Sequence, residues 1–193
     1  MPAADAGTQP TARPRVLLLA GLPGVGKTRL ARALAPRLDA VMLNRDDIRD
    51  AIFPERFLDY SDGQNAVATR ALLAVLDYLL AGPRPAFVII DGKPFSKARE
   101  IEEVRSPVER HGAELVVIHC VAAPEAIERR LREDLSADPR NLRAGRDPEK
   151  AARIRDSFEP IEAPHIVLDT GDAPERVVGA CLRALNAYRP SEA

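Results

Sequence analysis

The chain has 193 residues and a mass of 21.0 kDa, which corresponds to roughly one domain. Its 28 basic and 29 acidic residues give a formal net charge of −1, which argues against a protein that coats nucleic acid without sequence preference, because such proteins are clearly basic. The sequence has no apolar run of transmembrane length, no secretory leader pattern at its start, and only two cysteines, so we expect a cytoplasmic protein without a disulfide framework.

Short apolar segments alternate with segments of helical period, between a disordered tail expected over 1–14 and a second tail over 189–193. Strands are predicted over 15–20, 40–43, 86–90, 114–121 and 165–168. Helices are predicted over 28–38, 46–53, 61–80, 97–112, 124–135, 148–157 and 174–187. Pro107 is expected to kink its helix or to divide it. The third helix places Val67, Leu72, Val75, Leu76 and Leu79 on one face. The alternation predicts an α/β domain over 15–188, with βαβ units that form a five-stranded parallel sheet covered by helices on both faces.

Residues 21–28 match the phosphate-loop pattern G-x-x-x-x-G-K-[ST] between a predicted strand and a predicted helix. Glycines let the backbone N–H groups point inward at a phosphate, and the helix directs its positive end at the same anion. Lys27 is expected to reach the β and γ phosphates and to act in catalysis, while the Thr28 hydroxyl is expected to bind Mg²⁺. The alternative is a plain glycine-rich turn between a strand and a helix. The expected nucleotide-binding residues of this loop are Gly21, Pro23, Gly24, Val25, Gly26, Lys27, Thr28 and Arg29.

Two of the three main classes of phosphate-loop protein lose support from the residues themselves. A motor ATPase would need a strand that ends in Asp-Glu, whereas the strand over 86–90 is followed by Asp91 and Gly92, and a GTPase would need Asn-Lys-x-Asp, which is absent. A kinase needs a phosphate grip, Mg²⁺, a base for the acceptor hydroxyl and cations over the transferred group. Asp91 is expected to hold Mg²⁺ through water, or else to be an ordinary turn residue at the end of its strand. Lys93 and Ser96 are expected to face the acceptor, with a solvated loop and a helix cap as the alternatives.

A charged segment follows the second predicted strand, at the sheet edge where ligands bind in open α/β folds. Asp46 is expected to accept the proton of a substrate hydroxyl. Arg45 and Arg49 are expected either to hold an anionic acceptor or to orient Asp46. The alternative is that Asp46 or Asp47 caps the next helix.

The phosphate loop and the segment Asn-Arg-Asp-Asp-Ile-Arg at 44–49 together resemble the 5′-hydroxyl polynucleotide kinase domain and its broader P-loop kinase family. Adenylylsulfate kinase, chloramphenicol phosphotransferase and zeta-toxin-like or AAA-type small kinases belong to the same group. The resemblance implies that Asp46 is the general base. Residues 157–170 are similar to the end of adenylylsulfate kinase, so the resemblance covers about 15–186. The chain departs from polynucleotide kinases at 91–96 and from adenylylsulfate kinases at 44–49, so the acceptor stays open.

In the small P-loop kinases, the region between the fourth and fifth strands is a lid, which the resemblance places at about 136–150. Eight arginines fall between 129 and 155, and the planar guanidinium group pairs two phosphate oxygens. Arg130 and Arg143 are expected to stabilise the transition state, and Arg140 and Arg146 to bind the nucleotide. The alternative is that the arginine-rich composition of the whole chain explains the cluster.

These observations favour a kinase that uses ATP and Mg²⁺ to phosphorylate a hydroxyl of a small metabolite or antibiotic-like compound. Near-neutral charge and few aromatic residues favour a small acceptor. A polynucleotide 5′-hydroxyl kinase, favoured by 44–49, and an ATP-binding module without kinase activity are the alternatives. The acceptor, the choice between ATP and GTP and the oligomeric state stay open.

Overall fold

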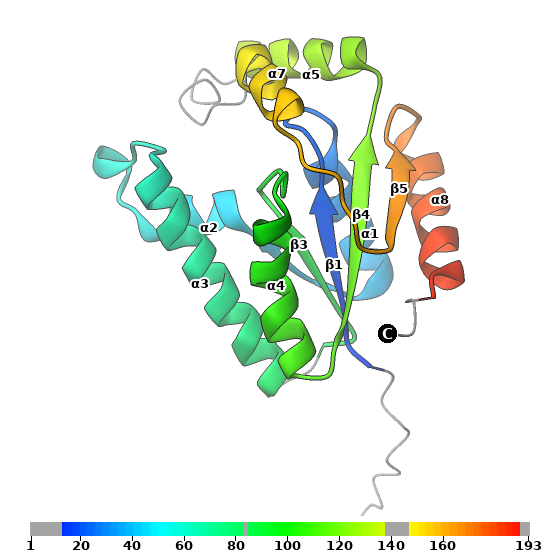
Figure 1. Ribbon diagram of the computed structural model, residues 1–193. Helices are drawn as coiled ribbons and strands as arrows, with labels where there is room; N and C mark the ends of the chain where they lie inside the picture. The colour runs from blue at the N-terminus through cyan, green and yellow to red at the C-terminus, as the bar shows by residue number, and fades with distance from the viewer. Residues whose placement is uncertain (1–12, 83–84, 138–146, 190–193) are drawn as a thin grey trace, which may run out of the picture.

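The computed structural model describes residues 13–82, 85–137 and 147–189, which form one parallel sheet with helices on both faces (Figure 1). The strands, in the spatial order β2-β3-β1-β4-β5, are β1 (Arg15–Ala20), β2 (Val41–Asn44), β3 (Phe87–Asp91), β4 (Glu114–Val121) and β5 (His165–Asp169). The helices are α1 (Lys27–Leu38), α2 (Arg45–Ile52), the 3₁₀ turn η1 (Glu55–Phe57), α3 (Asp62–Ala81), α4 (Ala98–Arg110), α5 (Pro124–Ala137), α7 (Pro148–Asp156) and α8 (Pro174–Ala187). The predicted five-stranded parallel sheet is confirmed.

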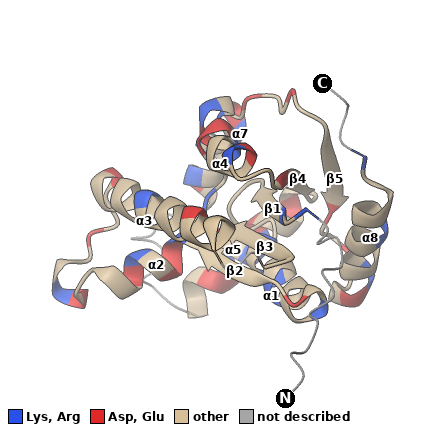
Figure 2. Ribbon diagram, turned by 90° about the horizontal axis from the view of Figure 1, so that it is seen from below, with Lys and Arg blue, Asp and Glu red and all other residues tan. Residues whose placement is uncertain are grey.

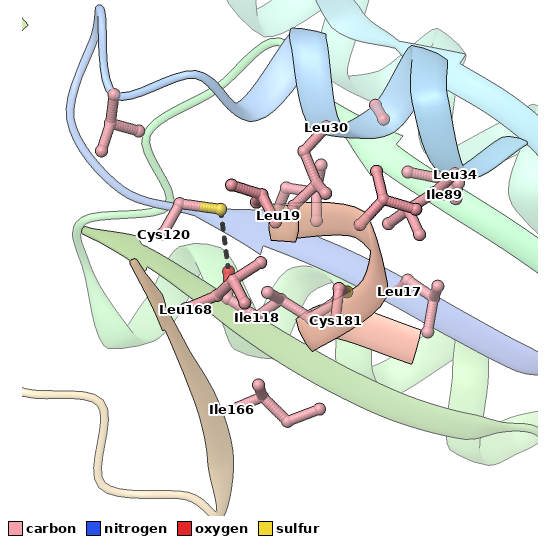
Figure 3. Packing of buried hydrophobic residues seen from close by; sticks show 14 of the residues in the cluster. Leu17, Leu19, Leu30, Leu34, Ile89, Ile118, Cys120, Ile166, Leu168 and Cys181 are labelled. Atoms are coloured by element: carbon pink, nitrogen blue, oxygen red, sulfur yellow. Dashed lines mark hydrogen bonds between the residues drawn. The ribbon is translucent and has the colours of Figure 1, made fainter. Parts of the chain in front are cut away.

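The central strand β1 is buried on both faces, which explains its uninterrupted apolar sequence. Leu17 and Leu19 face a core cluster shared with α1, α5 and α8. Leu18 faces the opposite cluster, which includes side chains from α3 and α4. Figure 3 shows the first cluster, in which Cys181 of α8 lies beside the strand residues. Each face of the sheet therefore has its own layer of helices.

Two helices differ from the expectations. The buried stripe of α3 follows an i, i+4 spacing, while Val67 and Val75 are exposed. The residues of that stripe are Gln64, Ala68, Leu72, Leu76 and Leu80. The helix α4 runs through Pro107 as one element, so of the two alternatives at this proline the division into two helices is wrong.

The ends of the domain and the predicted lid fall partly outside the described residues. Pro14, at the end of the predicted tail, is buried, and its carbonyl oxygen accepts a hydrogen bond from the Glu114 N–H at 2.8 Å. Residues 1–12, 138–146 and 190–193 are outside the described residues, so most of the predicted lid and its arginines 140, 143 and 146 are too. Within the described residues, no helix combines the length and the apolar character that a membrane span requires.

The sheet brings three polar segments to one edge. The phosphate loop follows β1, Asn44 ends β2 and Asp91 ends β3, and β3 lies between the other two strands. Asn44 and Asp91 are paired in register. Because all strands are parallel, these segments meet at the carboxyl edge, where ligands bind in open α/β folds.

Candidate nucleotide and acceptor site

A cleft of about 1330 Å³ opens at this edge. The phosphate loop, the start of α2, the β3–α4 loop, α5 and the β5–α8 loop all contribute to its lining. Figure 2 shows that basic and acidic residues lie next to each other along α2, which forms one of these walls. The cleft thus joins the segments that the sequence marks as phosphate-binding and as catalytic.

The phosphate loop requires glycine where the chain has it. Gly21, Gly24 and Gly26 have φ angles of 135°, 74° and 106°, which side-chain-bearing residues rarely adopt. A Cβ atom at Gly24 would lie 2.6 Å from Cγ of Leu131, and one at Gly21 would meet the carbonyl oxygen of Cys120. The loop therefore packs closely against β4 and α5, and its shape depends on these contacts.

Most residues predicted to bind nucleotide line the cleft, but not all do so. Pro23, Gly24, Gly26, Lys27, Thr28 and Arg29 line it. The side chain of Val25 is buried in the core, and Gly21 is buried with its N–H donating to Pro94 O at 2.9 Å. Lys27 is only 8% exposed, and its Nζ donates to the carbonyl oxygens of Gly21 (2.8 Å) and Leu22 (2.9 Å). Its ammonium group therefore lies against the loop that would hold a phosphate chain.

Asn44 connects two of the segments. Its Oδ1 accepts hydrogen bonds from the N–H groups of Asp46 (2.8 Å) and Asp47 (3.1 Å), and its Nδ2 donates to Oδ2 of Asp91 (2.9 Å). Asn44 is thus the N-cap of α2, and the alternative that Asp46 or Asp47 caps the helix is wrong. Sequence reasoning missed this residue, although an Asn between a strand and an Asp-Asp pair is a recognised capping signal.

Asp91 is fully buried, and among the described residues its Oδ1 has no hydrogen-bond partner. A buried carboxylate oxygen without a partner is rare, because burial without a hydrogen bond costs free energy. Such an oxygen suits an ordered water molecule or a hydrated cation. The residues present therefore fit Mg²⁺, with Asp91 and Thr28 on the cleft wall.

We expect Asn44→Ala to lower the free energy of unfolding by about 2–3 kcal/mol, because it removes a helix cap and leaves the buried Asp91 carboxylate with one partner fewer. Urea unfolding measures this loss. Ser61→Ala is the matched control, because Ser61 caps α3 through Gln64 N–H but has no such second role. Equal losses in the two variants would contradict the connecting role of Asn44.

Asp46 lies between two arginines. Its Oδ1 accepts hydrogen bonds from Nη2 of Arg45 and Nη1 of Arg49, both at 2.8 Å. Arg49 is 3% exposed and also donates to Oδ1 of Asn65 at 3.1 Å, while its guanidinium group lies 4.5 Å from the ring centroid of Tyr60. Of the two roles expected for the arginines, this geometry supports the orientation of Asp46. Charge-assisted bonds of this kind restrict a carboxylate strongly.

Of the other predicted site residues, Lys93 and Arg130 line the cleft, but both already have partners within the protein. Lys93 lines the cleft, but its Nζ lies 3.2 Å from Oε1 of Glu100, which is an ion pair within the β3–α4 region. The cap residue of α4 is Lys97, so the alternative that Ser96 caps this helix is wrong. Arg130 lines the cleft with its Nη atoms bonded to main-chain carbonyl oxygens.

Thr170, which was not among the predicted site residues, also lines the cleft. It is 6% exposed, and its Oγ1 lies within hydrogen-bond distance of two carbonyl oxygens, those of Val25 and Val121, which share its single hydroxyl proton. Apolar side chains from two helices line the same part of the cleft. They are Leu30, Ala33, Val177 and Val178. Leu30, Val177 and Val178 are nearly buried, so they give this part of the cleft an apolar wall of small exposed area.

The cysteine and histidine side chains do not form a reactive site. Burial raises the pKa of the Cys120 thiol to about 12, so the thiol stays protonated at neutral pH and is a poor nucleophile. Figure 3 shows Cys120 among apolar side chains, with its Sγ near the carbonyl oxygen of Ile118. Burial lowers the pKa of His119, whose ring stacks on Phe158 at 5.2 Å. Among residues 13–82, 85–137 and 147–189, no three His, Cys, Asp or Glu side chains gather as a metal site.

Solved structures with a similar fold include several kinases. A putative kinase from Chloroflexus aurantiacus superposes with a TM-score of 0.70 at 20% identity, over 89% of this chain and 98% of that one. An APS kinase from Mycobacterium tuberculosis, solved with AMPPNP and APS, gives 0.65 at 18% identity over 90% and 98%. A gluconokinase from Sinorhizobium meliloti gives 0.61 at 15% identity over 90% and 93%. At these identities, the likeness establishes a P-loop kinase-like fold.

A tRNA dimethylallyltransferase from Desulfosudis oleivorans is 31% identical over 177 residues, covering 82% of this chain and 54% of the relative. The chain thus spans about half the length of that curated relative. Residues 16–161, which are most of the domain, match the family described as AAA domain. Together with the phosphate loop between β1 and α1, this match establishes that the chain belongs to the AAA-domain family of P-loop proteins.

Proposed function

We propose that this protein is a kinase that transfers the γ-phosphoryl group of ATP to a hydroxyl group of a small molecule. The observation that carries the proposal is the position of Asp46. Its carboxylate is held by two arginines on the wall of the same cleft that contains Lys27 and Thr28 of the phosphate loop. A phosphoryl donor and a proton acceptor can therefore share one cleft.

The phosphate loop and Asp91 would hold the donor. The backbone N–H groups of the loop and the Lys27 ammonium group would bind the phosphate chain, with Lys27 exchanging its carbonyl partners for phosphate oxygens. Thr28 and the partnerless Oδ1 of Asp91 fit Mg²⁺, which when bound neutralises charge on the phosphates. The apolar end of the cleft near Val177 would receive the base of the nucleotide.

Asp46 would act on the acceptor. A carboxylate near the transferred phosphoryl group accepts the proton of the attacking hydroxyl as the oxygen–phosphorus bond forms. Arg45 and Arg49 would keep Asp46 in one orientation. This would lower the entropy cost of reaching the reactive geometry.

The charge of the cleft supports a small acceptor. Among the described residues, eight basic and eight acidic side chains line it, so it is not the basic groove that a polyanion requires. The alternative of a polynucleotide 5′-hydroxyl kinase rests on the segment at 44–49. The match to a tRNA dimethylallyltransferase favours a separate second candidate function, the transfer of a dimethylallyl group to tRNA.

One assay with several acceptors tests the proposal. The full chain is incubated with γ-labelled ATP, Mg²⁺ and one compound at a time from a set of sugars, sugar acids, adenylylsulfate, hydroxyl-bearing antibiotics and a 5′-hydroxyl oligonucleotide. A labelled dimethylallyl donor with tRNA forms a further arm. We expect label on one small hydroxyl compound. Label on the oligonucleotide or the tRNA alone, or ATP binding without transfer to any acceptor, would overturn the proposed acceptor class.

A further inference from the structure

Two side chains from distant parts of the sequence bond to the same carbonyl oxygen of the phosphate loop. The hydroxyl of Thr170 and Nη1 of Arg130 both donate to the carbonyl oxygen of Val25, the arginine at 2.9 Å. Nη2 of Arg130 also donates to the carbonyl oxygen of Thr170 at 2.8 Å. The three residues thus form one hydrogen-bonded group on the outer side of the loop.

This group determines the direction of the next N–H group. In a planar trans peptide, the C=O of one residue and the N–H of the next point in opposite directions, and the described residues contain no cis peptide. Because the Val25 carbonyl points toward Thr170 and Arg130, the Gly26 N–H points away from them. Gly26 itself lines the cleft with a φ of 106°, and because glycine has no Cβ atom its backbone could take other orientations if the carbonyl were released.

Arg130 differs in this from its neighbour on the same helix. The side chain of Arg129 is 64% exposed, and its Nε lies 3.9 Å from a carboxylate oxygen of Glu133. Arg130 instead reaches across to the phosphate loop and to the residue after β5, where its two Nη atoms donate to the carbonyl oxygens of Val25 and Thr170. A guanidinium group committed in this way acts on the loop rather than directly on a phosphate.

We infer that Thr170 and Arg130 are positioning residues for phosphate binding: by holding the Val25 carbonyl oxygen, they turn the Gly26 N–H toward the bound phosphate chain. The inference rests on the proposed function only in taking a nucleotide as the ligand of the loop. It revises the expected role of Arg130, which was direct stabilisation of the transition state.

The variants Thr170→Val and Arg130→Met test the inference, since both remove the donors, while valine keeps the shape of threonine and methionine keeps an unbranched apolar stem. Thr170→Val also keeps the Thr170 N–H bond to the Val121 carbonyl oxygen at 2.8 Å, although it loses the hydroxyl contact to that same oxygen at 2.9 Å. Thr170→Ser restores the hydroxyl. Arg129→Met is the matched control on the same helix, and Thr69→Val removes a hydroxyl that donates to the Asn65 carbonyl oxygen within α3.

The first measurement is calorimetric binding of Mg·ATP, Mg·ADP and AMP to the full chain. We expect Thr170→Val and Arg130→Met to weaken Mg·ATP and Mg·ADP binding about tenfold, the scale of one well-placed hydrogen bond to a charged group, while AMP binding changes little. Thr170→Ser should restore the affinity, and the two controls should bind as the wild type does. Unchanged Mg·ATP affinity in a folded Thr170→Val variant, or an equal loss for AMP, would overturn the inference.

The second measurement needs no ligand and separates the inference from the proposed function. We expect the Gly26 amide signal in a ¹H–¹⁵N spectrum to move in Thr170→Val and in Arg130→Met and to stay in Arg129→Met. A wild-type chain that binds no Mg·ATP would refute the proposed function, and the Gly26 signal would still decide the inference. A Gly26 signal that stays in place in both test variants overturns it.

Discussion

Asp46→Asn is expected to slow phosphoryl transfer by about 10²- to 10⁴-fold, the range associated with the loss of a general base. The affinity for Mg·ATP should stay the same, because Asp46 is separate from the phosphate loop. The substitution is conservative for structure, since both arginine bonds are made to Oδ1, an atom that asparagine keeps, and neither of these two bonds uses Oδ2. Single-turnover transfer to the acceptor found in the assay above measures the rate.

Asp47→Asn is the control for this prediction. Asp47 is the next residue on α2, is exposed and also lines the cleft, so the substitution removes the same charge from nearly the same place. Its transfer rate should stay close to that of the wild type. A fast Asp46→Asn variant would show that another group takes the proton, and a slow Asp47→Asn variant would show that the charge of the cleft matters more than the identity of the base.

The parts of the site that the sequence predicted are those determined by local structure. The phosphate loop depends on glycines within a few residues of one another, and an apolar strand precedes it, so pattern and context lie in one short segment. Asp91 was predicted because the end of a buried parallel strand always reaches the edge of the sheet. The contact between Asp91 and Asn44 could not be predicted in the same way, because it depends on the register in which β2 pairs with β3.

The parts that the sequence did not predict depend on distant contacts. A cation at position 130 suggested a phosphate ligand, but its partners are carbonyl oxygens of residues 25 and 170, which only the folded sheet brings near. Thr170 carries no local signal beyond its place after a strand. In α3, apolar residues occur around most of the helix, so period alone did not choose between Ala68 and Val67 as the buried position.

Lys27→Met is expected to weaken Mg·ATP binding about 10- to 100-fold and to slow transfer by about 10²-fold or more, because the lysine would meet phosphate oxygens both in the bound donor and in the transition state. Methionine keeps the unbranched stem in a site that is 8% exposed, so the loss is mainly that of the ammonium group. Calorimetry with Mg·ATP and single-turnover transfer measure the two effects separately.

Lys97→Met serves as the control for charge, because Lys97 pairs with Glu159 at 3.3 Å and does not line the cleft. Its binding and transfer should be those of the wild type. The two variants are then expected to differ in kind: Lys27→Met should lose affinity and rate together, whereas Asp46→Asn should lose rate alone. A Lys27→Met variant that binds Mg·ATP normally would mean that the backbone of the loop holds the phosphate chain without the lysine. Phosphate binding in the proposed mechanism would then be assigned to the N–H groups of Gly24 and Gly26 instead of Lys27.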